Sequence, residues 1–186
     1  ENRIAGYRNF ATKLWNAARF GEMNEAVLPA DFDESKVKSA VNKWIIAKAK
    51  QASEEVTDNL NAFRFSDAAN AVYQFVWGSF CDWYIEMIKP ILYGENQEEK
   101  AETRASFAWV LKRILIILHP FMPFITEEIY QAIPHDCESI MISKWVEYDE
   151  SLCFAENEAK MEILMSAIRA IRNRRAEMNI PPSKKA

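Results

Sequence analysis

The sequence is poor in the residues from which catalytic and cofactor sites are usually built. Four of its 186 residues are glycine, and they are too widely spaced for a phosphate-binding loop of the GxGxxG or GxxxxGK type. The two histidines and three cysteines include no CxxC pair, so neither a disulfide framework nor a zinc site is indicated. We therefore expect no catalytic residue, metal or cofactor within this chain, and reduced thiols in a cytoplasmic setting.

Long apolar runs are also missing. The longest clean run covers residues 114–118 and directly follows Lys112 and Arg113, which is far short of the ~20 residues that cross a bilayer. There is no signal-like segment and the first residue is Glu1, so we interpret the chain as a piece of a longer protein and expect no contact with a membrane. With 49% hydrophobic and 27% charged residues, the composition is typical of a globular domain with a sizeable core.

Charge is distributed unevenly along the chain. The formal net charge is -4, yet residues 1–20 carry four basic and one acidic side chain, and residues 160–185 carry seven basic and two acidic ones. An acidic body with two basic ends repels a polyanion except at those ends. Any contact with nucleic acid is therefore expected to be local, although a solvated surface explains the same charge runs.

Apolar residues recur at helical spacing almost throughout, and no segment alternates as a strand does. Helices are predicted over residues 2–20, 35–62, 66–90, 98–118, 126–133 and 155–178. We expect Gly21 to end the first helix, Pro90 to end the third and Thr126 to cap the fifth. Long helices with short links favour an all-α antiparallel bundle over residues 1–152, followed by a C-terminal helix and linker over residues 153–186.

The first helix is predicted to have two different faces. At 100° per residue, the expected buried stripe lies within about 60° of Ala11 and comprises Ile4, Tyr7, Ala11, Leu14, Trp15 and Ala18. On the opposite side, Phe20 lies in line with Lys13, Asn9 and Asn16, while Arg8 and Arg19 flank the stripe. One face therefore combines an aromatic ring, an ammonium group and two amides that burial does not require.

This combination suits single-stranded or looped RNA. An aromatic ring can stack on an unpaired base, amides can read base edges and cations can hold phosphates. The alternative is that Phe20 turns back at the end of the helix and anchors the following loop as a hydrophobic plug. The spacing of the residues leaves both readings open.

A second basic cluster lies on the last predicted helix, beside an apolar stripe of Met161, Leu164, Ile168 and Ile171. Arg169, Arg172 and Arg175 are candidate contacts to a nucleic-acid backbone. A solvated and partly ion-paired face is the alternative.

Several segments together resemble the anticodon-binding domain of valyl-tRNA synthetases, which belong to the class I aminoacyl-tRNA synthetases. They are RNF at 8–10, KLWNAARF at 13–20, FCDWY at 80–84, IKP at 88–90, LHPFMPFITEE at 118–128 and RAEMN at 175–179 before PP at 181–182. The resemblance covers nearly the whole chain in the same order. The proline-rich segment is shared with the isoleucyl, leucyl and methionyl enzymes, whereas FCDWY and RAEMN-PP favour the valyl enzyme.

The resemblance implies a helical bundle that follows a Rossmann catalytic domain and receives the anticodon loop of valine tRNA. It also implies that Lys13, Arg19 and Phe20 contribute to anticodon reading, and that ATP binds to the catalytic domain of the parent chain. Asn16, Asn9 and Arg8 are added from the helical arrangement alone. Two alternatives remain, namely the same module from an isoleucyl or related synthetase and a helical domain that docks onto another protein.

Overall fold

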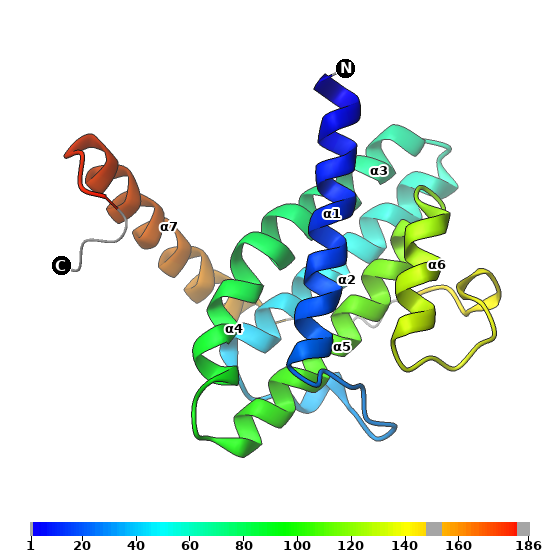
Figure 1. Ribbon diagram of the computed structural model, residues 1–186, viewed down its shortest axis with the longest axis horizontal. Helices are drawn as coiled ribbons and strands as arrows, with labels where there is room; N and C mark the ends of the chain where they lie inside the picture. The colour runs from blue at the N-terminus through cyan, green and yellow to red at the C-terminus, as the bar shows by residue number, and fades with distance from the viewer. Residues whose placement is uncertain (1, 148–153, 182–186) are drawn as a thin grey trace.

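The structure is a computed structural model that describes residues 2–147 and 154–181, and this part of the chain contains helices and no strands. This confirms the predicted all-α bundle (Figure 1). The α-helices are α1 (Asn2–Met23), α2 (Ala40–Asn61), α3 (Phe65–Gln74), α4 (Ile85–Leu92), α5 (Gln97–Leu118), α6 (Pro123–Ala132) and α7 (Ala155–Glu177). The π-helix η2 (Phe75–Tyr84) joins α3 to α4, and η1 (Glu34–Lys36) and η3 (Ile140–Ile142) are short 3-10 turns.

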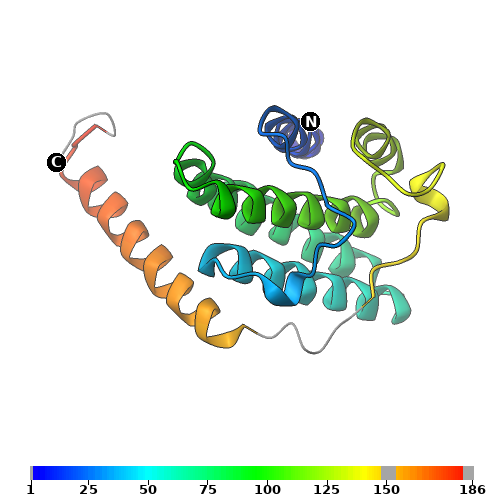
Figure 2. The same ribbon diagram turned by 90° about the horizontal axis from the view of Figure 1, so that it is seen from below.

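Helix α5 is the central element of the bundle. It contacts α1, α2, α3, α4 and α6, and Figure 2 shows α1 and α6 on one side of it and α2 on the other. Its side chains Phe107, Ile114 and Leu115 are almost fully buried. The start of α5 is well defined because the Asn96 side chain accepts hydrogen bonds from the backbone N–H groups of Glu98 and Glu99.

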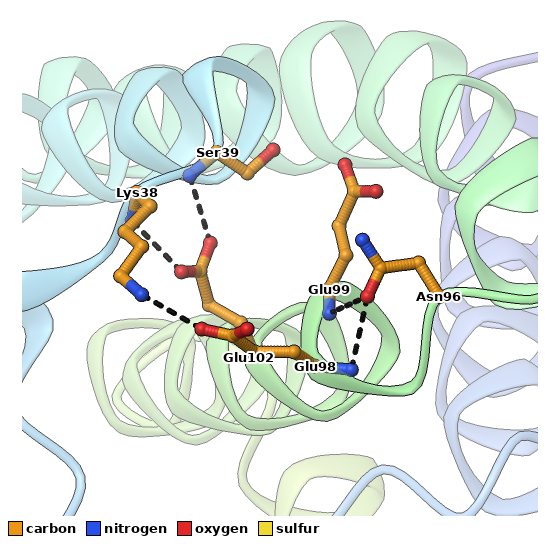
Figure 3. Close-up of polar contacts among 6 residues, drawn as sticks. All are labelled: Lys38, Ser39, Asn96, Glu98, Glu99 and Glu102. Carbon is orange, nitrogen blue, oxygen red and sulfur yellow. Dashed lines mark hydrogen bonds and ion pairs between the residues drawn. The ribbon is translucent and has the colours of Figure 1, made fainter.

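A carboxylate of α5 also holds the start of α2 in place. Glu102 accepts hydrogen bonds from the backbone N–H of Lys38 at 2.8 Å and of Ser39 at 2.9 Å (Figure 3). These N–H groups lie at the positive end of the α2 dipole, so a carboxylate is favoured there. Deeper in the bundle, the buried Asn42 of α2 donates to Thr103 of α5 and accepts from the Tyr84 hydroxyl of η2, which fixes three elements relative to one another.

The third predicted helix runs on without a break through α3, η2 and α4. Pro90 lies inside α4 rather than at its end, so the predicted stop there is wrong. The last turn brings Leu92 into the core with 7% of its surface exposed. The free energy gained by this burial offsets the free-energy cost of the backbone hydrogen bond that proline cannot donate.

The predicted end of α1 at Gly21 is also wrong. The helix continues to Met23, and the chain reverses at Glu25, which has a φ of 56°. Gly21 instead allows close packing, because a Cβ atom there would lie 2.4 Å from Cε1 of Phe107. Thr126 is likewise not a cap, since α6 begins at Pro123 and the Thr126 hydroxyl donates to the backbone oxygen of Met122 within the first turn.

Helix α7 packs on α2 by its first half. Met161 and Met165 are buried, and Lys48 of α2 pairs with Glu158 at 3.0 Å. Of the apolar stripe, Met161 is buried and Ile168 is partly buried, whereas Leu164 and Ile171 are 47% and 61% exposed. Figure 1 shows α7 running away from the other helices toward its C-terminal end. The division between residues 1–152 and 153–186 stays a prediction, since its boundary lies outside the described residues.

Candidate nucleic-acid interface

The orientation of α1 decides which of the predicted site residues a ligand can reach. Phe10, Leu14, Ala17 and Gly21 are buried, whereas Tyr7 is 68% and Trp15 39% exposed. At 100° per residue, the centre of the buried face lies roughly 90° from Ala11. Of the predicted stripe, Leu14 and Ala18 are buried, as expected, whereas the prediction is wrong for Tyr7 and Trp15. Gly21 lies close to the ring of Phe107 and Ala17 is buried on the same face, whereas the larger Tyr7 and Trp15 are exposed.

Phe20 is not the unburied ring that the helical arrangement predicted. It is partly buried and packs on the core, with its ring centroid 5.9 Å from that of Phe107. Its backbone oxygen accepts a hydrogen bond from the Asn24 side chain at 2.8 Å, which ties the helix end to the following turn. This geometry matches the alternative, in which Phe20 anchors the loop. A stacking role for Phe20 in RNA binding stays a prediction.

Lys13 lies on the same flank of α1 as Phe20 and faces η2. Its ammonium group forms an ion pair with Oδ1 of Asp82 and sits 3.8 Å above the centre of the Trp77 ring. The Lys13 and Asp82 side chains are 27% and 46% exposed, so solvent reaches the pair. Burial raises the pKa of the neighbouring Cys81 thiol to about 12, and it therefore adds no negative charge here at neutral pH.

The other four predicted residues of α1 point away from the core. Arg8, Asn9, Asn16 and Arg19 are all exposed, and within residues 2–147 and 154–181 their side chains have no ion pair or hydrogen bond. Asn9 and Asn16 lie on the flank of Lys13. Arg19 lies nearer to α6 and lines a hollow of about 70 Å³ with Trp15 and Ile133. The structure thus brings together Lys13, Asn9 and Asn16, and places Arg8 and Arg19 further round the helix.

The arginines of α7 have partners within the molecule. The guanidinium carbons of Arg169 and Arg172 lie 5.2 and 5.5 Å from the centre of the Trp83 ring, which is within the range of a cation–π interaction. Arg175 donates to the backbone oxygen of Pro181 at 3.1 Å. Their predicted contact with an RNA backbone is untested, but Arg169 and Arg172 also attach the second half of α7 to η2.

Sequence reasoning missed the two tryptophans of η2. Trp77 meets Lys13 of α1, and Trp83 meets Arg169 and Arg172 of α7, so η2 lies between the two basic elements, as Figures 1 and 2 show. A signal was present, because two residues six apart on a helix point about 120° away from each other. Trp77 and Trp83 therefore could not both belong to one buried stripe.

One further feature of the surface is a large apolar hollow. An apolar hollow of about 690 Å³ lies at the start of α1, lined by Tyr7, Phe10, Tyr73, Phe121 and other residues. Among the described residues there is no group of three His, Cys, Asp or Glu side chains that could hold a metal ion. None of the helices in this part of the chain is long and apolar enough to cross a membrane.

Comparison with known proteins shows a family match and several curated relatives. The family model described as the anticodon-binding domain of tRNA ligase matches residues 42–186. The chain is 50% identical to the valine--tRNA ligase of Caulobacter vibrioides, over all of this chain and 21% of that protein. It is 46% identical to the enzyme of Ruegeria pomeroyi, over 97% of this chain and 18% of that protein. It is also 45% identical to the valine--tRNA ligase of Bacillus cereus, over 95% of this chain and 20% of that protein.

The chain therefore spans about a fifth of the length of these relatives. Helix α1 precedes the region that the family model matches, but the match to the Caulobacter vibrioides protein includes it.

Proposed function

The chain belongs to the anticodon-binding domain family of tRNA ligases, and we propose that it binds the anticodon loop of valine tRNA isoacceptors as part of a longer valine--tRNA ligase. The observation that carries this proposal is the outer surface of α1. There the exposed Asn9 and Asn16 lie on the flank of the Lys13–Asp82 pair, and the exposed Arg8 and Arg19 lie further round the helix. Amides and cations on one exposed helix suit an RNA loop with unstacked bases.

The proposed task is recognition. By holding the anticodon loop, the bundle would place the acceptor end of the tRNA in a catalytic domain elsewhere in the longer protein, where ATP and valine react. This chain then needs no cofactor of its own, and the activity belongs to the cytoplasm, where such tRNAs are charged. Lys13, Asn9 and Asn16 would face the bases, while Arg8 and Arg19 would face phosphates.

The same catalytic domain is the proposed protein partner. The apolar hollow at the start of α1 is bordered by Tyr7, which is 68% exposed, and by Tyr73. Exposed aromatic residues around a hollow are typical of a surface that another domain covers, and the relatives are about five times as long as this chain.

Binding to exchanged anticodons tests the proposal. We expect the 186-residue chain to bind a valine tRNA more tightly than the same tRNA carrying an isoleucine anticodon, measured by fluorescence anisotropy with labelled RNA. Arg19→Ala should weaken binding about fivefold, because it removes a cation that contacts RNA. The exposed Lys144, which lies beside η3, is the matched control, and Lys144→Ala should have little effect.

Other outcomes of this experiment would favour the alternatives. A preference for the isoleucine anticodon would assign the module to an isoleucyl or related synthetase. Absence of binding to any tRNA at low salt would favour a helical domain that docks onto another protein, and would contradict the proposal.

A further inference from the structure

The basic cluster on the second half of α7 has no part in the proposed function. Arg169 and Arg172 are both exposed, and their guanidinium carbons lie 5.2 and 5.5 Å from the centre of the same Trp83 ring. Residues three apart on a helix lie on one face. Two cations of α7 therefore converge on one aromatic side chain of η2.

The hydrogen-bond donors of these two side chains are unused. Within residues 2–147 and 154–181, neither Arg169 nor Arg172 forms an ion pair or a hydrogen bond. By contrast, Arg174 of the same helix pairs with Glu177 at 3.0 Å. A guanidinium group carries five N–H donors in one plane, and attraction to an aromatic face gives them no acceptor. The two arginines on Trp83 therefore present donors and positive charge that an anion can use.

Trp83 orients both guanidinium groups before a ligand arrives. Its ring is partly buried and packs on the core, so the surface against which the arginines lie is fixed. An arginine side chain loses rotamer entropy when it binds a ligand, and contact with a fixed ring removes part of that cost in advance.

The chemistry of the two arginines suits phosphate oxygens. The planar fork of a guanidinium group matches two oxygens of one phosphate, and charge-assisted hydrogen bonds of this kind are stronger than neutral ones. Each arginine can hold one phosphate of a strand, or both can hold the same one.

The carboxylates near Trp83 do not oppose an anion with a free charge. Asp82 and Glu86 are the acidic residues closest to Trp83 in the sequence, and each is paired with a lysine. Asp82 pairs with Lys13, and Glu86 pairs with Lys89 at 2.6 Å. Each pair has no net charge, so an anion at the two arginines meets an excess of positive charge.

RNA held on α1 can reach these arginines. Lys13 of α1 contacts Trp77, which precedes Trp83 by six residues in the same element. At about 1.5 Å per residue, the two positions are separated by about 9 Å along the helix axis. Stacked nucleotides rise ~3.4 Å each, so about three nucleotides of one strand span this distance. The nucleotides next to an anticodon loop belong to its stem.

We propose that Arg169 and Arg172, oriented by Trp83, form a phosphate-binding site that holds the backbone of the RNA stem next to the loop on α1. We call these three residues the α7 clamp. The inference rests on the proposed function and adds α7 as a second contact for the same RNA. Phosphates carry no sequence information, so the clamp contributes affinity and orientation and does not choose between anticodons.

Two RNAs of different extent test the α7 clamp by fluorescence anisotropy. One is a valine anticodon stem-loop, and the other is a single-stranded oligonucleotide with the loop sequence alone. We expect the double variant Arg169→Gln, Arg172→Gln to bind the stem-loop about tenfold more weakly. The slope of the logarithm of this affinity against the logarithm of the salt concentration should become shallower by about 1.8, because each phosphate contact on a duplex contributes about 0.9. Affinity for the loop oligonucleotide should change less than about twofold.

Arg174→Gln is the matched control for the single variant Arg172→Gln. Both remove one charge from α7, but Arg174 points about 160° away from Arg172 and pairs with Glu177. Arg172→Gln should weaken stem-loop binding about threefold, whereas Arg174→Gln should have little effect. Circular dichroism checks that the variants are folded.

Trp83→Ala separates phosphate contact from the attachment of α7. This variant removes the ring but keeps both charges. It should weaken stem-loop binding by about threefold, which is less than in the double arginine variant, and leave the salt slope unchanged, because the arginines can still reach phosphates without being oriented.

Four results would overturn the α7 clamp while RNA binding itself stands. Unchanged stem-loop affinity in the double variant would show that the arginines do not contact RNA. An equal loss for both RNAs, or equal effects of Arg172→Gln and Arg174→Gln, would show that they act only through overall charge. A loss in Trp83→Ala as large as in the double variant would show that they act by attaching α7. If the unmodified chain binds neither RNA at low salt, the proposed function fails as well.

Discussion

Gly21 and Gly78 are both helical glycines, yet their surroundings are opposite. A Cβ atom on Gly21 would collide with the Phe107 ring at 2.4 Å, whereas one on Gly78 would meet nothing within 4 Å. Phe107 is 1% exposed and packs against Phe80 and Tyr84, so its ring has no space into which to move. The first glycine is required by packing, and the second is not required by the fold.

We predict opposite effects when each of these glycines is replaced by alanine. Gly21→Ala should lower the free energy of unfolding by about 1–3 kcal/mol, because it overpacks the core. Gly78→Ala should raise it by about 0.5 kcal/mol, because alanine loses less backbone entropy in a helix. Urea unfolding followed by circular dichroism measures both. A tolerated Gly21→Ala would contradict the close contact with Phe107.

Phe20 and Lys13 show why single residues of α1 were hard to place from the sequence. Aromatic residues occur on several sides of this helix, at Tyr7, Phe10, Trp15 and Phe20. A hydrophobic face chosen from them depends on which rings are taken as buried. Which face of α1 is buried depends on the element that it packs against. The buried side carries the small residues Ala17 and Gly21, and Gly21 lies against Phe107 of α5.

At the scale of elements, the π-helix η2 lies between α1 and α7 and contacts basic side chains of both. It directs Trp77 toward α1 and Trp83 toward α7, and π-helical segments occur frequently at functional sites. Within the second half of α7, residues 166–177, no residue is fully buried, since Ile168 is partly buried and Ile171 is 61% exposed. Trp83 is therefore expected to control how firmly this half is held.

We predict that Trp83→Ala releases the second half of α7. Amide hydrogen exchange over residues 166–177 should become several times faster, because about 0.5–1 kcal/mol is lost for each cation–π contact at an exposed site. Exchange around Met161 and Met165 should change little, since these side chains are buried independently. Trp83→Phe retains an aromatic face and should give a smaller effect. Unchanged exchange in Trp83→Ala would show that the arginines do not attach the helix.

At the scale of the whole molecule, one hollow gathers acidic side chains while the outer surface of α1 carries exposed basic ones. The acidic cluster of Glu54, Glu55, Asp58 and Asp67 lines a hollow formed by α2 and α3, whereas Arg8 and Arg19 occupy the outer surface of α1. A polyanion is thus repelled from one region and attracted to another. This asymmetry orients an RNA ligand before any base is read.

We predict that RNA binding weakens steeply as salt rises and that α1 accounts for part of this dependence. The measured quantity is the slope of the logarithm of the RNA affinity against the logarithm of the salt concentration. In the double variant Arg8→Ala, Arg19→Ala this slope should become shallower by about 1.4. Each phosphate contact on a single strand contributes about 0.7. Lys144→Ala should leave the slope unchanged. An equal slope in the double variant would show that these arginines do not contact phosphates.

The order and type of the helices could be predicted because their causes are local. The helical period of apolar residues indicated all the main helices, and Asn96 and Pro123 mark the starts of two of them in the structure. The stops expected at Gly21 and Pro90 failed for a shared reason. At both positions the tertiary packing, against Phe107 and around Leu92, outweighs the local preference to end the helix.

The sequence by itself determined that this protein is helical, that its two ends carry net positive charge around an acidic middle, and that its motifs resemble an anticodon-binding domain. Only the tertiary structure decided which flank of α1 is buried and which residues face Lys13. The physical reason is that helical periodicity depends on neighbours within a few residues. The pairing of Lys13 with Asp82, 69 residues away, depends on how α1 and η2 pack around Phe107, and no local pattern specifies that contact.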